Sequence, residues 1–261
     1  MTAPAAHAAS SPPALTHAEH VMGTVFSFAV RDPAPAVEAA LGAAVARLHA
    51  IDALFSPYRP ESEVSRVADG LLAPADADPQ LTEVLERCRE VAQQTEGWFT
   101  AHPGGRLDPS GWVKGWAVEQ ACELLCRAGS TDHCVNGGGD IQSVGGPWRV
   151  GVADPARPGA LATVLAGRDL VVATSGVAER GAHILDPHTG APARGLRSLT
   201  LVGTGRGRIA RVDAWATAAF AMGPELGLAW AERQPDLEAF ALLTDPAAPP
   251  RCTSGFLRHA G

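Results

Sequence analysis

The spacing of apolar residues predicts helices and strands in mixed order along the chain. Apolar positions return every three or four residues over 36–55 and 81–95, which is the period of a helix. An alternating pattern over 21–30, rich in β-branched and aromatic residues, predicts a strand that begins near Met22. No fixed repeat period is visible, so this mixture favours an α+β fold over a doubly wound α/β sheet.

The second half of the chain predicts several strands and two further helices. A helical pattern over 209–222 stops at Gly223-Pro224, and a shorter one covers 226–233. Residues 1–19, rich in Ala, Pro and Ser, are expected to be a disordered leader, and 20–261 a single domain. The predicted strands cover 148–152, 161–165, 170–174, 183–185, 198–202, 238–243 and 252–257.

The stretch 107–144 carries the most unusual local chemistry. Asp108 lies in a turn before a predicted helix, for which Ser110 is a good N-cap candidate and Gly129 a natural end. Lys114 falls in the first turn, where the helix dipole disfavours a cation. An anion such as a phosphate at this helix start would explain the lysine, and a solvated surface lysine is the alternative. The glycine-rich run 136–140 ends in Asp140; it allows close backbone approach to a ligand and is equally consistent with a tight turn.

Composition narrows the class of protein. The chain has 261 residues, 46% of them hydrophobic, and a net charge of -7 with no long basic run, which argues against a general nucleic-acid binder. No segment approaches the length of a membrane span, and 1–20 lacks the features of a secretory signal or a lipid-attachment cysteine. We therefore expect a cytoplasmic protein.

The five cysteines have no short framework spacing, which predicts reduced thiols. Cys122 and Cys126, four residues apart, are followed closely by His133 and Cys134. A zinc site is conceivable there, and buried small thiols are the alternative that we favour.

Asp213 and Thr217 are four residues apart on a predicted helix, so they share a face. A carboxylate and a hydroxyl are hard oxygen ligands that suit Mg²⁺ or Ca²⁺. The alternative is an aspartate that complements the helix start beside an exposed threonine. His183, before an apolar pair and the turn 186–190, is by itself more typical of a packed or surface histidine than of a base.

Taken in order, these segments resemble the ApbE family, flavin transferases that move FMN from FAD onto a protein threonine or serine. Each motif alone is weak evidence for this family. The ordered set, from about Met22 to Gly223, is specific for it. The matching segments are 22–24, 56–66, 108–117, 135–141, 174–176, 183–190 and 213–217.

The resemblance implies an α+β, duplicated tunnel-type fold with FAD in a cleft between two halves. It also implies FAD as substrate, one catalytic Mg²⁺ held by the Gly111 carbonyl with Asp213 and Thr217, and an external acceptor flavoprotein. His183 matches a family histidine proposed to act in the transfer. The residues expected to contact FAD by motif position are Met22, Tyr58, Trp98, Phe99, Thr100, Asp108, Lys114 and Ile184.

Two departures from the family pattern stand out. Thr100 occupies a position that is usually acidic, and the stretch between Phe99 and Asp108 is shorter than in many members. Many members are exported lipoproteins, whereas this sequence predicts neither a secretory signal nor a lipid-attachment cysteine. Two other functions fit the same motifs. One is an FAD pyrophosphatase, in which water replaces the acceptor, and the other is a flavin-binding module without catalytic activity. A domain whose site has decayed is disfavoured by the intact Asp108, Asp213, Thr217 and His183.

Overall fold

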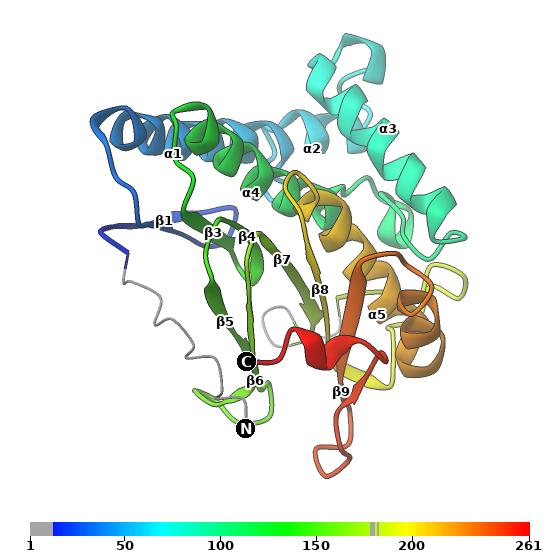
Figure 1. The fold of residues 1–261 in the computed structure, drawn as a ribbon. Helices are drawn as coiled ribbons and strands as arrows, with labels where there is room; N and C mark the ends of the chain where they lie inside the picture. Colours follow the sequence, from blue (N-terminus) through cyan, green and yellow to red (C-terminus); the bar gives the residue numbers. More distant parts are fainter. Residues whose placement is uncertain (1–12, 178–180, 182) are drawn as a thin grey trace, which may run out of the picture.

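The computed structural model, which describes residues 13–177, 181 and 183–261, is built on an eight-stranded antiparallel sheet (Figure 1). The strand order is β1-β2-β3-β4-β7-β8-β9-β10. A separate hairpin, β5 (Trp148–Ala153) and β6 (Leu161–Gly167), lies outside this sheet. The strands of the large sheet are β1 (Leu15–Val21), β2 (Thr24–Val30), β3 (His133–Gly137), β4 (Asp140–Val144), β7 (Leu170–Gly176), β8 (Leu196–Thr204), β9 (Leu237–Leu243) and β10 (Arg251–Cys252).

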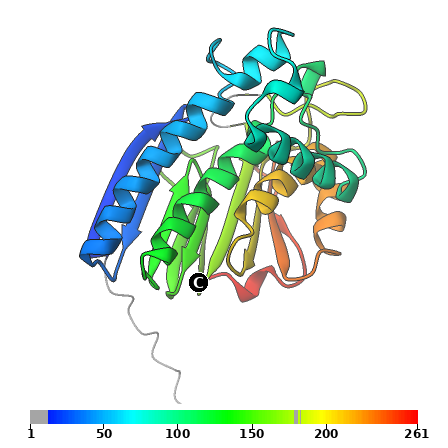
Figure 2. The same ribbon diagram turned by 90° about the horizontal axis from the view of Figure 1, so that it is seen from above.

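The long helices lie side by side across one face of the sheet (Figure 2). α4 packs between α1 and α5, and α5 contacts β7 and β8. Each half of the fold consists of a hairpin, a helical segment and a second hairpin. The first half contains the hairpins β1-β2 and β3-β4, and the second contains β7-β8 and β9-β10. The α+β fold and the expected duplication are thereby confirmed. The helices are α1 (Pro35–Phe55), α2 (Glu63–Ala68), α3 (Pro79–Gln94), α4 (Ser110–Arg127) and α5 (Ile209–Ala231), with 3₁₀ turns at Pro74–Asp76, Pro103–Gly105 and Phe256–Arg258.

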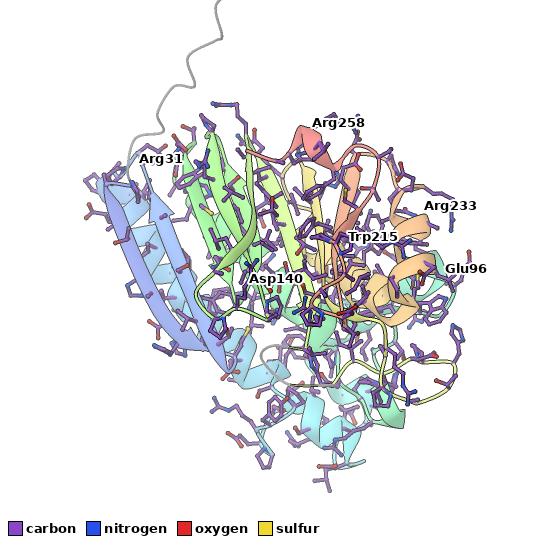
Figure 3. The ribbon with its side chains drawn as sticks, turned by 90° about the horizontal axis from the view of Figure 1, so that it is seen from below. Arg31, Glu96, Asp140, Trp215, Arg233 and Arg258 are labelled. Carbon is purple, nitrogen blue, oxygen red and sulfur yellow. The ribbon has the colours of Figure 1, made fainter. Side chains whose placement is uncertain are left out.

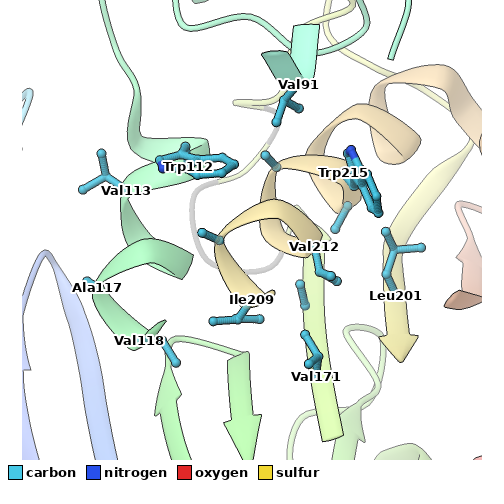
Figure 4. Close-up of a cluster of buried hydrophobic side chains, with 14 of the residues drawn as sticks. Val91, Trp112, Val113, Ala117, Val118, Val171, Leu201, Ile209, Val212 and Trp215 are labelled. Atoms are coloured by element: carbon cyan, nitrogen blue, oxygen red, sulfur yellow. The ribbon is translucent and has the colours of Figure 1, made fainter. Parts of the chain in front are cut away.

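Apolar side chains form a core on each face of the sheet. The larger core joins the helices to the strands, and Figure 4 shows Val118 of α4, Val212 of α5 and Leu201 of β8 within it. The smaller core lies beneath β5-β6 and the C-terminal turn, where Phe240 stacks on Phe256 at 5.0 Å between ring centroids. In the part of the chain that the structure describes, no helix is both long and apolar enough to cross a membrane.

Phe26 of β2 is fully buried against Gly137 of β3. A Cβ atom at Gly137 would lie 2.6 Å from Cε1 of Phe26, so the missing side chain makes room for the ring. We expect Phe26→Ala to lower the free energy of unfolding by about 3–5 kcal/mol, because it leaves a cavity under the helical layer. Urea unfolding measures this. Val25→Ala, at a neighbouring position that is 39% exposed, is the control and should cost less than about 1 kcal/mol; equal losses in the two variants would contradict this packing.

Most of the predicted helices are confirmed, with one correction at a helix start. Ser62 caps α2 as its side chain accepts from the Ser65 N–H at 3.1 Å. Ser110, however, is the first residue of α4 and not its N-cap. Pro109 occupies the N-cap position, and the Asp108 carboxylate accepts the Ser110 N–H at 2.9 Å. Gly223 interrupts α5 with a φ of 79°, at the predicted break.

Three strand predictions need correction. Met22 and Gly23 form the two-residue turn of the β1-β2 hairpin, with φ of 55° and 69°, so the strand begins at Thr24. The predicted leader was drawn too long, because Leu15–Val21 is strand β1; residues 1–12 lie outside the described residues. The segment 183–185 forms no strand but one isolated bridge, Leu185 to Pro192, and 252–257 contributes only Cys252 to a strand. Short apolar runs beside prolines and turns are ambiguous in sequence.

His133 begins β3 in a buried polar network. Its Nδ1 lies 2.8 Å from Oγ of Ser130, and that hydroxyl donates to the Asp32 carboxylate at 2.7 Å. Cys126 Sγ lies 3.9 Å from the other ring nitrogen. Burial lowers the pKa of His133 from 6.5 to about 4. The imidazole is therefore neutral in the folded protein at physiological pH.

This lowered pKa predicts a pH-dependent stability. As pH falls below 6.5, the unfolded chain takes up a proton at His133 before the folded chain does, so stability declines towards pH 4. The contribution lost between pH 7 and pH 5 is about 2 kcal/mol. Urea unfolding at both pH values should show a smaller change for His133→Gln than for the wild type. Parallel pH dependences in the two proteins would refute the prediction.

Candidate functional site

A cavity of about 940 Å³ opens at one end of the sheet. The β1-β2 turn, the β3-β4 turn, the end of β7 and part of β5 form its strand side. The end of α1, the start of α4, one face of α5 and the loops 98–103 and 183–187 complete its wall. Both four-stranded halves therefore contribute to it.

The residues expected to act together from the sequence all line this cavity. They come from six separate segments of the chain. They are Met22, Tyr58, Trp98, Phe99, Thr100, Asp108, Gly111, Lys114, His183, Ile184, Asp213 and Thr217.

The loop after α1 forms one rim of the cavity. Arg59 pairs there with Asp52 of α1 at 3.1 Å and with Glu61 at 3.0 Å. Tyr58, beside them, is 74% exposed, so a large part of its ring faces the opening. An aromatic ring at a cavity mouth can stack on a flat ligand.

Helices α4 and α5 approach each other closely beside the cavity. A Cβ atom at Gly115 would lie 2.8 Å from both the Asp213 Cβ and the Ile209 carbonyl oxygen, so only glycine fits. The Gly115 N–H donates to Oδ2 of Asp213 at 2.9 Å. One turn earlier, a Cβ at Gly111 would lie 3.6 Å from Oγ1 of Thr217. The predicted aspartate–threonine pair therefore lies against the first two turns of α4.

Lys114 is mostly buried and pairs with an acidic side chain, so it is not a solvated surface lysine. Its Nζ lies 2.5 Å from Oδ2 of Asp140, and the two side chains are 22% and 0% exposed. Burial raises the pKa of Asp213 well above its ordinary value, and the nearby Asp140 carboxylate raises it further. Lys114 and the Gly115 N–H act in the opposite direction. The cavity wall thus holds two acidic groups and one ammonium from three elements of the fold.

The oxygen donors here fit a divalent cation. Among the described residues, no three His, Cys, Asp or Glu side chains are placed to hold a metal ion, which leaves the zinc interpretation of Cys122, Cys126 and Cys134 unsupported. All five cysteines lie in the described residues and are free thiols. Asp213, Thr217 and the nearby Gly111 backbone instead form a set of hard oxygens beside the cavity, the chemistry that Mg²⁺ prefers with waters and phosphate oxygens.

Two loops meet at another part of the cavity wall. His188 contacts Trp98 edge-on, with ring centroids 4.5 Å apart. His183 is exposed, and its Nδ1 lies 3.0 Å from the Gly181 carbonyl oxygen. Because a carbonyl only accepts, Nδ1 carries the proton in this arrangement, and Nε2 is left with a lone pair.

The glycine-rich turn does two jobs that its sequence could not separate. Gly137 makes room for Phe26, and Gly138 lies against Thr24, where a Cβ would be 2.7 Å from the hydroxyl oxygen. Gly138 and Gly139 line the cavity, and Asn136 closes the turn by accepting the Gly139 N–H at 2.9 Å. Both the tight turn and the open approach to the cavity are therefore present.

Ser175 and Asp140 were not predicted as site residues. The Ser175 hydroxyl lies 3.3 Å from that of Thr217, and Ser175 is 6% exposed. Asp140 does not line the cavity but lies behind Lys114. The motifs 174–176 and 136–140 marked both segments, but nothing in them shows which partner each side chain meets.

The sequence model of the ApbE family matches residues 22–104 and 100–241. The FAD:protein FMN transferase of Rhodobacter capsulatus is 33% identical over 138 residues, which are 48% of this chain and 26% of that protein. The FAD:protein FMN transferase of Klebsiella pneumoniae is 30% identical over 182 residues, 65% of this chain and 56% of that protein. The chain thus spans less than two thirds of the length of these relatives.

Solved structures show the same fold. The ApbE protein from Thermotoga maritima superposes with a TM-score of 0.80 at 20% identity, over 95% of this chain and 99% of that one. The flavin transferase ApbE from Vibrio cholerae gives a TM-score of 0.77 at 20% identity, over 96% and 99% of the two chains. At such identity the likeness concerns the fold.

Proposed function

The chain belongs to the ApbE family, and from this premise we propose that it transfers the FMN half of FAD to a threonine or serine hydroxyl of an acceptor protein, with Mg²⁺ and with release of AMP. The observation that carries the proposal is the convergence of the twelve motif residues on one cavity. Its volume of about 940 Å³ is at the upper end of the range for ligand pockets, as a dinucleotide requires. Two relatives bear the name of this activity.

In the proposed reaction, the acceptor oxygen forms a bond to the phosphorus on the FMN side of the pyrophosphate. The bond from that phosphorus to the bridging oxygen breaks, and its electron pair leaves with AMP. The hydroxyl proton passes to Nε2 of His183, which has a lone pair when Nδ1 donates to Gly181. No oxidant or reductant is required.

The chain's other groups position the nucleotide. Lys114 supplies positive charge at the start of α4, and backbone N–H groups at a helix start suit a phosphate. Tyr58 and Trp98 are placed for the flat rings, while Met22, Phe99, Thr100, Asp108 and Ile184 complete the contacts. The Gly111 carbonyl, Asp213 and Thr217 would hold Mg²⁺, which when bound would neutralise phosphate charge.

The acceptor is a separate protein. We place this chain in a reducing compartment, the cytoplasm, because its five cysteines are free thiols, which are typical of proteins in such a compartment. Water in the place of the acceptor hydroxyl would give FMN and AMP instead. A binding module would hold FAD without cleaving it.

The test is incubation with FAD and Mg²⁺, with and without a candidate acceptor protein. We expect AMP release and a fluorescent acceptor band that survives denaturation, both lost when EDTA is present. AMP released at the same rate without acceptor, and no labelled band, would identify a pyrophosphatase. FAD that is bound but uncleaved in every sample would identify a binding module.

A further inference from the structure

The loop 183–193 reaches from the second half of the fold to the first. Near its tip, the ring of His188 lies edge-on against that of Trp98, with centroids 4.5 Å apart and an angle of 80° between the ring planes. Gly97 makes room for this contact, because a Cβ atom there would lie 3.4 Å from Cε1 of His188. His188 does not line the cavity, whereas His183 of the same loop does. The proposed contacts with FAD therefore do not account for His188.

The loop is closed on itself by hydrogen bonds. Near its base, the Ala193 N–H donates to the Ile184 carbonyl at 2.9 Å. At its tip, the Asp186 carboxylate accepts the His188 N–H at 2.8 Å. A side chain that bonds a backbone N–H two residues further on holds the turn in one conformation. The place of the His188 backbone therefore helps to fix that of Ile184 and of its neighbour His183.

Trp98 is a firm anchor because it follows directly on the end of α3. The buried Thr95 hydroxyl accepts the Phe99 N–H at 3.1 Å, which ties the chain after Trp98 back to the helix. The end of α3 is also bound to α5, because the indole N–H of Trp215, labelled in Figure 3, donates to Oε1 of Gln94 at 3.2 Å. The segment that carries Trp98 is thus fixed to two helices.

We propose that His188 is a positioning residue whose ring, packed against Trp98, holds the loop 183–193 at the cavity so that Nε2 of His183 meets the acceptor hydroxyl. The proposal rests on the proposed function, in which His183 takes the proton of that hydroxyl. Trp98 is also placed for a flat ring of FAD, so nucleotide binding and placement of the base depend on the same side chain. His188 itself touches neither FAD nor the acceptor.

The first test is the rate of flavin transfer at saturating FAD, measured by labelling of the acceptor protein. His188→Ala removes the ring and keeps the N–H that Asp186 accepts, so the turn persists. We expect the rate to fall by about fivefold, the effect of losing one edge-on ring pair. The loop is loosened but not released, because Leu185 still approaches Gly104, where a Cβ atom would lie 3.8 Å from its Cδ1.

Two further single variants show whether the ring contact is responsible. His188→Phe keeps a ring against Trp98 without a ring nitrogen, so its rate should stay within about twofold of the wild type. His20→Ala, at an exposed histidine of β1 outside the cavity lining, is the matched control and should transfer flavin at the wild-type rate. A rate of His188→Phe as low as that of His188→Ala would overturn the proposal.

A double variant separates positioning from a merely structural role. If His188 acts through His183, adding His188→Ala to His183→Gln should cost less than about twofold beyond His183→Gln alone. A further fivefold loss would show that the two residues act independently, and would overturn the proposal. The affinity of His188→Ala for FAD, measured without acceptor by quenching of flavin fluorescence, should stay within about twofold of the wild type. A loss of affinity equal to the loss of rate would assign His188 to binding instead.

Hydrogen exchange of the segment 183–193 tests the contact without FAD or acceptor. We expect faster exchange in His188→Ala than in the wild type and in His188→Phe, because the loop opens more often. Equal exchange in the three proteins would overturn the proposal.

The failure of the proposal and that of the proposed function are distinct. If the wild type transfers flavin and His188→Ala does so at the same rate, the role of His188 is wrong and the proposed function stands. If the wild type transfers no flavin, the proposed function fails, and the role of His188 fails with it.

Discussion

Asp213→Asn is expected to slow Mg²⁺-dependent AMP release from FAD by about a thousandfold, equivalent to about 4 kcal/mol in the transition state. The substitution removes the only charge that α5 offers to the cation within the described lining of the cavity. An asparagine keeps an oxygen that can accept the Gly115 N–H, now 2.9 Å from the carboxylate, so the contact between α4 and α5 is preserved. Chromatographic assay of AMP over a series of Mg²⁺ concentrations measures the effect.

The control for this variant is Asp236→Asn, an exposed aspartate with a φ of 56°. Asparagine adopts such a φ readily, so activity should be unchanged. Thermal unfolding of Asp213→Asn should occur at the wild-type temperature or above, because the substitution removes a buried acid whose ionisation burial opposes. AMP release within tenfold of the wild type, with the fold intact, would exclude Asp213 as a metal ligand.

His183→Gln should slow transfer of flavin to the acceptor by about a hundredfold to a thousandfold, since a positioned general base typically contributes that much. Glutamine keeps polar atoms in the loop but has no basic nitrogen to take the acceptor proton. The affinity for FAD should change little, because His183 is exposed at the cavity and is assigned to the acceptor hydroxyl. The rate of band labelling and the quenching of flavin fluorescence on binding measure these two quantities separately.

His102→Gln, at an exposed histidine outside the cavity lining, is the matched control and should transfer flavin at the wild-type rate. If His183→Gln also transfers flavin at that rate, His183 is not the base. If it loses FAD affinity in proportion to rate, His183 acts in binding and not in proton transfer.

Sequence reasoning recovered the fold class and the set of cavity residues for different physical reasons. Helical periodicity is strong over α1 and α3, whose buried positions repeat every three or four residues, so these helices were predictable within one or two residues of their ends. The site residues came from ordered motifs. The turn at 136–140 shows why a motif can be read in two ways, because Gly137 serves packing while Gly139 faces open space.

The predictions that failed concern features that depend on contacts between residues far apart in the sequence. Strand β1 was missed because its alternation is between small or polar residues, and pairing with β2 defines it. The partners of Lys114 and Thr217 were not predictable, since Asp140 and Ser175 reach them only through the folded sheet. The helix cap was assigned to Ser110 because sequence alone does not show whether Asp108 or Ser110, two residues apart, turns its side chain back to the helix start.

We propose that one cavity holds both FAD and a divalent cation, and that the cation lies between the Gly111 carbonyl, Asp213 and Thr217. The most direct measurement is anomalous diffraction from crystals of the protein grown with FAD and Mn²⁺. We expect a manganese peak within coordination distance of those three oxygens and of the FAD pyrophosphate. A manganese peak elsewhere, or FAD bound outside this cavity, would contradict it.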